Sequence, residues 1–418
     1  MDAHTCPGEP RLLISHRALR HNAGMLRAAV GESVKICAIL KADAYGHGAA
    51  AVARAMARGR LADALAVASL DEASVLPEVG VPVIVFRPVE NIYVGRQREQ
   101  LEEAIEHGWT LTICSAAAAG DVARLSLAMG KRAAVQVKID TGMSRSGVDD
   151  SEAREVIEAV LQQPALRLGG LCTHFACADE PDDVATAEQF RRFCEATDGF
   201  VDLNRAGRQP LRHAANTAAV LLHPNMHLDM VRPGLGLYGI DPMGAAAGRN
   251  LRPVMKWVAS LLMVRTVRKG ASAGYGLTWT APRDTRLGLV PVGYADGYMR
   301  SFSNRAKVMV NGVPAAVVGR VSMDLITVDL GAVPSAQQGD EVTLLDDDPA
   351  SPASVYALAE LGGTIPYEIF CRIGARVHRV GVEEIEAEDV NAFPAFLPVI
   401  QERGKSGASG EGMRVSRG

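Results

Sequence analysis

The chain has 418 residues, of which 48% are hydrophobic and 22% are charged, and its formal net charge is -4. This balance is typical of a globular protein of two or three domains, which can bury a large core without disulfide bonds. The slightly acidic charge does not favour nucleic acid or an anionic membrane surface as a partner.

Cysteine usage and the N-terminal sequence indicate the compartment. Seven cysteines lie far apart, their number is odd, and no Cys-x-x-Cys pair occurs. We therefore expect reduced thiols and no metal site. Residues 1–10 are polar, which predicts no signal peptide, and no apolar run is long enough to cross a bilayer. Together these features predict a cytoplasmic protein.

Residues 34–240 alternate between short apolar runs and amphipathic helical patterns such as 48–59, 151–163 and 185–197. Most of the runs are apolar on both faces, which is typical of parallel strands covered on both sides. This pattern predicts an α/β fold with an N-terminal (β/α)8 barrel of the TIM type over residues 10–250. The eight candidate strands are Val34–Leu40, Ala64–Ala68, Pro82–Phe86, Thr110–Cys114, Ala134–Ile139, Arg167–His174, Leu211–Ala214 and Gly234–Tyr238.

Residues 251–385 predict a second domain that is mostly β. Asn311-Gly312 lies between two of its strands, which is a strong hairpin signal, and a short helix is expected over 352–361. The candidate strands are Val258–Val267, Leu287–Val292, Val308–Val310, Ala315–Val318, Leu325–Leu330 and Glu341–Leu345.

The two ends of the chain need separate interpretations. Arg11–Ile14 reads as a strand that precedes a helix over 15–29, and it belongs either to the barrel or to the β domain. Residues 386–418 form a C-terminal extension. From about residue 402 it consists of glycine, serine and charged residues, and we expect it to be disordered there.

In a (β/α)8 barrel the functional side chains gather at the carboxyl ends of the strands. Unusual polar residues fall at five points of this kind, which chance rarely arranges. They are Lys41 after the first strand, Arg145 after the fifth, His174 at the end of the sixth, Asn216 and Thr217 after the seventh, and Arg232 just before the eighth.

Lys41 directly follows an apolar strand, so its side chain is expected to point into a partly dry pocket. Desolvation lowers the pKa of a lysine and favours the neutral amine, which is the form that attacks an aldehyde. A single lysine at a strand end is more often a solvated surface residue. Here, however, Lys41 opens the run Lys-Ala-Asp-Ala-Tyr-Gly-His-Gly, and this context favours a catalytic amine.

This run resembles the cofactor-binding signature of the alanine racemase family, and further blocks resemble the family in the same order. The likeness extends from about residue 10 to residue 380. It implies an enzyme that interconverts L- and D-alanine with pyridoxal 5′-phosphate (PLP), either to supply D-alanine for peptidoglycan or to degrade it. The blocks are Lys41–Gly48, Val137–Gly147, Thr173–Asp179, His213–Ala218, Val231–Gly239, Gly274–Gly276, Gly293–Tyr298, Gly319–Asp324 and Ile365–Glu368.

The resemblance implies a pair of catalytic residues. Lys41 would hold PLP and act as acid and base on one face of the substrate Cα, and Tyr275 would act on the other face. Racemisation requires such a pair, because one group removes a proton and another returns it from the opposite side. In the family the tyrosine comes from the partner subunit, so the resemblance also implies a homodimer with a shared active site.

Arg232 bears on the choice of reaction. In the family an arginine faces the pyridine nitrogen of PLP, and because it is always charged it keeps that nitrogen unprotonated. Prompt return of the proton to Cα is then favoured over transamination. We expect His213 to hydrogen-bond Arg232 or to be a satisfied structural histidine, and His174 to pack on the cofactor ring.

The remaining roles also follow from the resemblance. The phosphate would be held by Tyr45, Thr217, Tyr367 and the backbone N–H groups of Gly234 and Leu235. Asn216 would assist or would simply cap the following helix, and the two interpretations are compatible. Ser322 stands where the family often has cysteine, and we expect little effect on the chemistry.

Substrate contacts complete the predicted site. Arg145 would contact the PLP phenolate and the substrate carboxylate, and Met323 would close the pocket around a small side chain. Lys138 matches a lysine that is carbamylated in some members, where the carbamate would orient Arg145, and otherwise Lys138 is an ion-pair partner. An access corridor would be formed by Asp179, Tyr294, Arg300 and Arg320.

Three alternatives share this scaffold. The first is a racemase of serine, lysine or a broad set of amino acids. The second is a PLP decarboxylase, which Arg232 disfavours because such enzymes resemble a pattern with an acidic residue at the ring nitrogen. The third is a PLP-binding protein without catalysis. Such proteins resemble the barrel alone, so the β domain with Tyr275 and Met323 argues against it.

Overall fold

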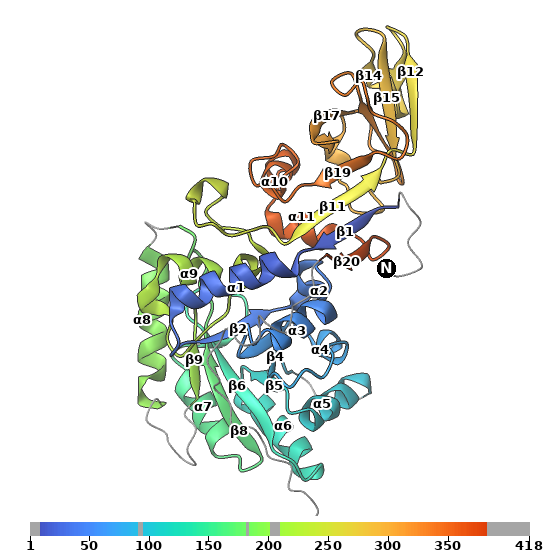
Figure 1. Ribbon diagram of the computed structural model, residues 1–418. Helices are drawn as coiled ribbons and strands as arrows, with labels where there is room; N and C mark the ends of the chain where they lie inside the picture. Colours follow the sequence, from blue (N-terminus) through green and yellow to red (C-terminus); the bar gives the residue numbers. More distant parts are fainter. Residues whose placement is uncertain (1–8, 91–94, 181–183, 201–209, 383–418) are drawn as a thin grey trace, which may run out of the picture. The chain divides into compact units, whose positions relative to one another are not determined.

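The structure is a computed structural model that describes residues 9–90, 95–180, 184–200 and 210–382 (Figure 1). Cys6 and the C-terminal extension expected over 386–418 lie outside these ranges. None of the described helices is long and apolar enough to cross a membrane.

Eight parallel strands form one sheet in the order β10-β2-β3-β4-β5-β6-β8-β9. Backbone hydrogen bonds join the two end strands, from Asp229 N to Arg212 O at 3.1 Å and from Arg232 N to Ala215 O at 2.8 Å. The predicted (β/α)8 barrel is therefore confirmed. Its strands are β2 Lys35–Ile39, β3 Ala64–Val67, β4 Val83–Pro88, β5 Thr110–Ile113, β6 Ala133–Asp140, β8 Leu166–Cys172, β9 Leu211–His213 and β10 Met230–Val231, and the short β7 Val148–Asp149 pairs with β6.

Helices follow most of these strands and surround them (Figure 1). Local sequence explains where they begin; for example, the Ser15 side chain accepts a hydrogen bond from Ala18 N and so caps α1. The helices are α1 His16–Val30, α2 Lys41–Tyr45, α3 Ala49–Arg58, α4 Leu70–Ser74, α5 Arg96–Glu106, α6 Ala116–Ala128, α7 Ala153–Leu161, α8 Val184–Thr197 and α9 Thr217–Leu222, with short 3-10 turns η1 Asp198–Phe200, η2 Pro224–Met226, η3 Leu235–Tyr238 and η4 Ala245–Ala247.

The eighth barrel strand lies earlier in the chain than the sequence suggested. The run Gly234–Tyr238 does not form a strand; most of it is the 3-10 helix η3, and the strand is β10. The N–H groups of Gly234 and Gly236 donate to Thr217 Oγ1 at 3.0 and 3.1 Å instead of to a neighbouring strand. A short buried apolar run fits either structure. Arg232 therefore follows the eighth strand and does not precede it.

The β domain is built on a nine-stranded sheet in the order β12-β15-β18-β17-β16-β19-β11-β1-β20. Strand β1 (Arg11–Ile14) lies between β11 and β20, with Leu12 opposite Trp257 on one side and Arg379 on the other. The run predicted as one strand over 258–267 is divided between two strands, β11 Met255–Ser260 and β12 Met263–Val267. The remaining strands of the sheet are β15 Thr285–Val290, β16 Lys307–Val310, β17 Val313–Val318, β18 Ile326–Asp329, β19 Glu341–Leu345 and β20 His378–Gly381. Outside this sheet, β13 Ser272–Ala273 pairs with β14 Trp279–Thr280.

The predicted hairpin at Asn311-Gly312 is confirmed. Val310 pairs with Val313 across the turn, and Asn311 and Gly312 have φ of 50° and 77°. Two positive φ values are what a tight hairpin needs to match the twist of its strands. The helices of this domain are α10 Val355–Gly362 and α11 Pro366–Arg372, with 3-10 turns η5 Tyr275–Leu277 and η6 Arg300–Phe302.

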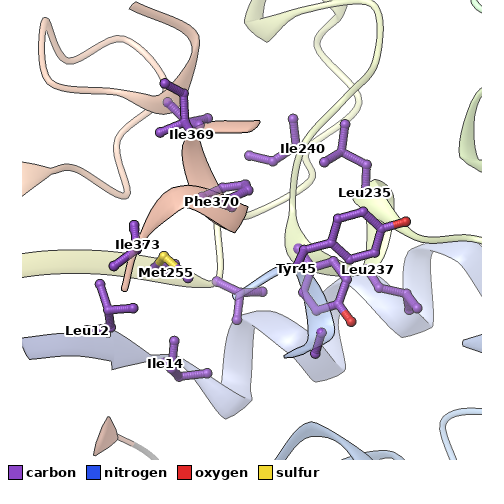
Figure 2. Close-up of a cluster of buried hydrophobic side chains, with 14 of the residues drawn as sticks. Leu12, Ile14, Tyr45, Leu235, Leu237, Ile240, Met255, Ile369, Phe370 and Ile373 are labelled. Carbon is purple, nitrogen blue, oxygen red and sulfur yellow. The ribbon is translucent and has the colours of Figure 1, made fainter. Parts of the chain in front are cut away.

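Part of the hydrophobic core connects α11 to strands β1 and β11 and to α2, the turn that follows β2. Figure 2 shows Phe370 of α11 and Ile373, which directly follows α11, near Leu12 and Met255, with Tyr45 in the same cluster of buried side chains. This packing fixes α11 against the turn that carries Lys41, and so it positions the candidate site.

Candidate active site

Lys41 stands at the start of an unusual backbone turn. The four residues from Ala42 to Tyr45 all have φ between 53° and 55°, so α2 is one left-handed turn. L-residues avoid this conformation at a cost of about 1–2 kcal/mol each. Glu72 of α4 helps to hold it, because Glu72 Oε1 accepts a hydrogen bond from Ala42 N at 2.9 Å. Gly46 ends the turn where a Cβ would lie 2.5 Å from Phe370 O.

The Lys41 amine has a lowered proton affinity. Burial lowers the pKa of Lys41, and the charges of Arg145 and Arg232 lower it further. This direction agrees with the prediction from the sequence, whereas the Lys41 residue as a whole is exposed in this chain and not enclosed in a dry pocket. Lys41 Nζ also lies 5.9 Å from the centre of the Tyr45 ring. The neutral amine is therefore more available at neutral pH than in an ordinary lysine.

Arg232 is a buried arginine whose hydrogen bonds go to neutral acceptors. Its Nη1 lies 2.9 Å from His213 Nδ1, as predicted, and its Nη2 lies 3.2 Å from His174 Nδ1. It also donates to the carbonyl oxygens of Thr173, His213 and Ala214. Burial lowers the pKa of Arg232. Because a guanidinium only donates, the Nδ1 atoms of both histidines accept.

Four cations converge around His174. After burial, the charges of Arg232, Arg145, Lys138 and Lys41 lower the pKa of His174 well below its usual value. The ring is thus neutral in a strongly positive environment. Such an arrangement favours an anionic ligand, which would offset the repulsion among the four charges.

Hydroxyl groups gather on the side of the site formed by α9, α11 and η3. Tyr45 is buried, its ring lies 5.6 Å from that of Tyr367, and a Cβ on Gly234 would be 2.5 Å from its hydroxyl oxygen. Thr217 Oγ1 already accepts two backbone N–H groups, so its own proton remains available. Asn216 caps α9, because its side chain accepts from Ala219 N at 3.0 Å.

Lys138 and Arg145 lie on β6 and on the loop that follows it. Lys138 Nζ donates to Ser146 Oγ, and burial lowers the pKa of Lys138. Asp140 orders the loop, since its carboxylate accepts hydrogen bonds from the backbone N–H groups of Ser144 and Arg145. The Arg145 side chain stays exposed and available to a ligand.

The β domain groups the other predicted residues in a second, exposed cluster. Tyr275 is 71% exposed, and a Cβ on the neighbouring Gly276 would lie 3.2 Å from the Arg320 guanidinium carbon. The loop of Tyr294 binds that of Met323: Tyr294 N donates to Ser322 O, and Ala295 N donates to Met323 O, both at 3.0 Å. Arg300 begins η6 and is also exposed.

Within one chain, the barrel cluster around Lys41 and the β-domain cluster around Tyr275 are not connected through these two predicted catalytic residues. Across the described ranges, Tyr275 and Lys41 share no hydrogen bond, ion pair or ring contact. Of the residues predicted to form an access corridor, Asp179 lies with the barrel cluster, where its charge, after burial, helps to raise the pKa of Tyr367.

Comparison with known proteins identifies the family. Residues 14–242 match the alanine racemase N-terminal domain, and residues 254–381 match the alanine racemase C-terminal domain. The chain belongs to the alanine racemase family. The resemblance predicted from the sequence is therefore confirmed.

Individual members of this family match over almost their whole length. The alanine racemase of Chlorobaculum tepidum is 37% identical over 380 residues, which cover 90% of this chain and 97% of that protein. The alanine racemase of Sorangium cellulosum is 40% identical over 373 residues, or 86% and 96% of the two chains. The crystal structure of alanine racemase from Streptomyces lavendulae matches with a TM-score of 0.81 and 34% identity, covering 91% of this chain and 99% of that one.

One structure in the alanine racemase family bears on the cofactor. The crystal structure of the Bartonella henselae enzyme is described with covalently bound pyridoxal phosphate; its TM-score is 0.75 and its identity 27%, covering 90% of this chain and all of that one. The residues present here fit such a group. The Tyr45 and Tyr367 hydroxyls have no hydrogen-bond partner among the described residues, and the absence of a side chain at Gly234 lets the Tyr45 hydroxyl lie close to its backbone, since a Cβ there would be 2.5 Å from Tyr45 Oη.

Several supporting residues of this alanine racemase fold were not found from the sequence. Glu72 completes a Ser-x-x-Glu helix start at Ser69, which is a recognisable signal, but its contact with Ala42 depends on the fold. Arg379 on β20 donates to Gly46 O at 3.1 Å and so ties the β sheet to the end of the Lys41 turn. Arg376 joins the loop after Tyr294 to the loop after Met323, since its side chain donates to Asp296 and to Asp324, each at 2.6 Å.

Proposed function

We propose that this protein interconverts L-alanine and D-alanine with PLP as its cofactor. The observation that carries the proposal is the pairing, at one barrel mouth, of a lysine of lowered pKa with a buried arginine on a chain of the alanine racemase family. Four cations around His174 suit a cofactor and a substrate that both carry negative charge.

PLP, when bound, supplies an electron sink that stabilises the negative charge left on Cα after proton removal. Lys41 would hold it, and the hydroxyls of Tyr45, Tyr367 and Thr217 would donate to its phosphate. Asn216 and the backbone of Gly234 and Leu235 would complete this cradle. Arg232 would face the ring nitrogen and, since it only donates, would keep that nitrogen unprotonated. His174 would pack beside the ring.

Two groups would move the substrate proton. Lys41 Nζ would take or return it on one face of Cα, because its lowered pKa leaves part of the amine neutral. Tyr275 Oη would do the same on the other face. Arg145 would hold the substrate carboxylate through its planar fork, which fixes the Cα between the two groups.

We also propose that Tyr275 acts on substrate bound at Lys41 of a second copy of the chain. Support comes from exposure: Tyr275 is 71% exposed and Met323 is 53% exposed. Large exposed apolar side chains grouped on one face are typical of an interface. In such a homodimer Met323 would bound the substrate pocket, and Asp179, Tyr294, Arg300 and Arg320 would line its access corridor.

Carbamylation of Lys138 is a further part of the proposal. Burial lowers the pKa of Lys138, and a neutral amine is the form that reacts with carbon dioxide. The nearby charge of Arg145 also lowers this pKa, and it would attract the resulting anion. An intact mass of the native protein with no carbamate, or a carbon NMR spectrum in labelled carbon dioxide without a new signal, would remove this part.

The proposed activity is tested by incubating the PLP-loaded protein with single L-amino acids and separating the enantiomers. D-alanine should form fastest, and exchange of the Cα proton with deuterated solvent should accompany it. Faster inversion of serine or lysine would support a racemase of another substrate. A protein that binds PLP and inverts no amino acid would instead be a binding protein, and the proposed function would be wrong.

A further inference from the structure

Two buried side chains in the barrel form a hydrogen-bonded pair with a fixed direction. Thr112 Oγ1 donates to Val85 O at 2.6 Å, and Gln136 Nε2 lies 2.8 Å from Thr112 Oγ1. Since the only hydroxyl proton points at Val85, Thr112 accepts from the amide. The amide of Gln136 is therefore oriented with Nε2 toward Thr112. Its Oε1 is buried and has no partner.

A second buried side chain has an unpaired atom of the opposite kind. His213 Nδ1 accepts from Arg232 Nη1 at 2.9 Å, so the proton of the neutral ring is on Nε2. Burial and the Arg232 charge keep this ring neutral by lowering the pKa of His213. The Nε2–H group is buried and has no partner among the described residues. A buried donor without an acceptor is rare in folded proteins.

The side chains that carry the two unpaired atoms, Gln136 and His213, both lie beside Gly170. The β6–β8 register shifts next to Gln136, and this irregularity brings Gly170 opposite Gln136, while Gly170 pairs with Leu211 of β9 on its other side. A Cβ on Gly170 would lie 3.2 Å from His213 Nε2 and 3.4 Å from Gln136 Cβ. Both side chains thus border the space that the missing side chain leaves free.

We propose that Gln136 is a positioning residue for Arg232, because one water trapped beside Gly170 accepts the Nε2 proton of His213 and donates to Gln136 Oε1. Every link then donates in the same direction, from Arg232 through His213, the water, Gln136 and Thr112 to Val85 O. This series of hydrogen bonds would hold the His213 ring in the orientation that accepts from Arg232, and so it would fix the place of the Arg232 guanidinium. The inference rests on the proposed function only in taking Arg232 to face the cofactor.

The test observes the His213 Nε2 proton by NMR on nitrogen-15 histidine-labelled protein, with the signal assigned through His213→Asn. We expect a slowly exchanging, downfield Nε2–H signal in the wild type, with and without PLP. Gln136→Leu should move it upfield and speed its exchange, and Gln136→Glu should move it further downfield, because a carboxylate is a stronger acceptor. If the His213 proton is on Nδ1, or if Gln136→Leu leaves the signal unchanged, the proposed series of hydrogen bonds does not exist.

A second variant keeps the inference testable where Gln136→Leu does not fold. Thr112→Val removes only the group that orients the amide, and it should shift the His213 signal in the same direction by a smaller amount. Thr197→Val is the matched control, since Thr197 is buried and its hydroxyl donates to Phe193 O, which is not part of the proposed series of hydrogen bonds. An equal effect of both valine variants would overturn the inference. If the protein does not racemise alanine, the NMR result still shows whether Gln136 is linked to His213.

Kinetics on the PLP-loaded protein give an independent measure. A displaced Arg232 should lower kcat for alanine by about tenfold with little change in KM, because Arg232 is not proposed to touch the substrate. Normal kcat in Gln136→Leu, together with a shifted His213 signal, would show that the series of hydrogen bonds exists but does not position Arg232. The proposed positioning role of Gln136 would then be wrong.

Discussion

Gly234→Ala tests the phosphate side of the proposed site. A Cβ at this position would lie 2.5 Å from Tyr45 Oη and 3.1 Å from its Cζ. The ring cannot easily turn aside, because it is buried with its centre 5.1 Å from that of Tyr238 and 5.6 Å from that of Tyr367. We therefore expect the added methyl group to displace the Tyr45 hydroxyl from its place beside Gly234.

The size of the effect follows from the lost hydrogen bond. A hydrogen bond to a charged group contributes about 1.5–3 kcal/mol. Since about 1.4 kcal/mol changes a dissociation constant tenfold, the affinity of the protein for PLP should fall by about 10- to 150-fold. The crowding is present without the cofactor as well, and it should lower the free energy of unfolding by about 1–3 kcal/mol.

The assay is titration of PLP into the cofactor-free protein, followed by visible absorbance. Gly24→Ala is the matched control, because a Cβ on Gly24 in α1 meets nothing within 4 Å, and it should leave PLP affinity unchanged. In a Tyr45→Phe background the nearest crowded atom is gone, so adding Gly234→Ala should cost little further affinity. An equal loss in both backgrounds, or no loss in the single variant, would refute the reasoning.

Three further predictions concern the amine, the phenol and a buried histidine. Lys41→Ala should abolish both racemisation and the covalent retention of PLP after borohydride reduction, read by mass spectrometry, and full activity would contradict its role. Tyr275→Phe should keep PLP but slow racemisation in both directions, while exchange of the Cα proton with deuterated solvent persists for the enantiomer whose proton faces Lys41, as measured separately on L- and D-alanine. Burial lowers the pKa of His47 to about 4 from 6.5, so the unfolded chain binds more protons in this window and stability falls as pH drops through it. His47→Gln should remove about 2 kcal/mol of the stability lost between pH 8 and pH 5, read by denaturant unfolding; an unchanged pH dependence would count against the burial argument.

The elements that the sequence predicted well are those specified by neighbouring residues. The hairpin at Asn311-Gly312 needs only two residues that accept positive φ. The start of α1 at Ser15 needs only a side chain that reaches Ala18 N. The eighth strand was misplaced because Leu235–Tyr238 is buried and apolar in either conformation, and the distant Thr217 hydroxyl decides between them.

The left-handed turn after Lys41 could not be predicted, for a similar reason. Ala42, Ala44 and Tyr45 prefer the right-handed region, and Asp43 alone, which tolerates positive φ, cannot specify four such residues in a row. Contacts from elsewhere impose the turn: Glu72 from another helix, and Arg379 and Phe370 from the end of the chain. The chemical identity of the site residues is therefore local information, whereas the backbone that presents them depends on the complete fold.

Arg145 offers a final test that separates charge from binding. Its charge lowers the pKa of Lys41, so Arg145→Gln should raise that pKa, whereas Arg145→Lys should keep it low. The pKa is measured on cofactor-free protein from the pH dependence of Lys41 reductive methylation, and Arg96→Gln at an 81% exposed site is the control. An unchanged or lower Lys41 pKa in Arg145→Gln would refute the electrostatic account. Activity alone would not decide this, because either substitution also removes the planar fork that we propose holds the substrate carboxylate.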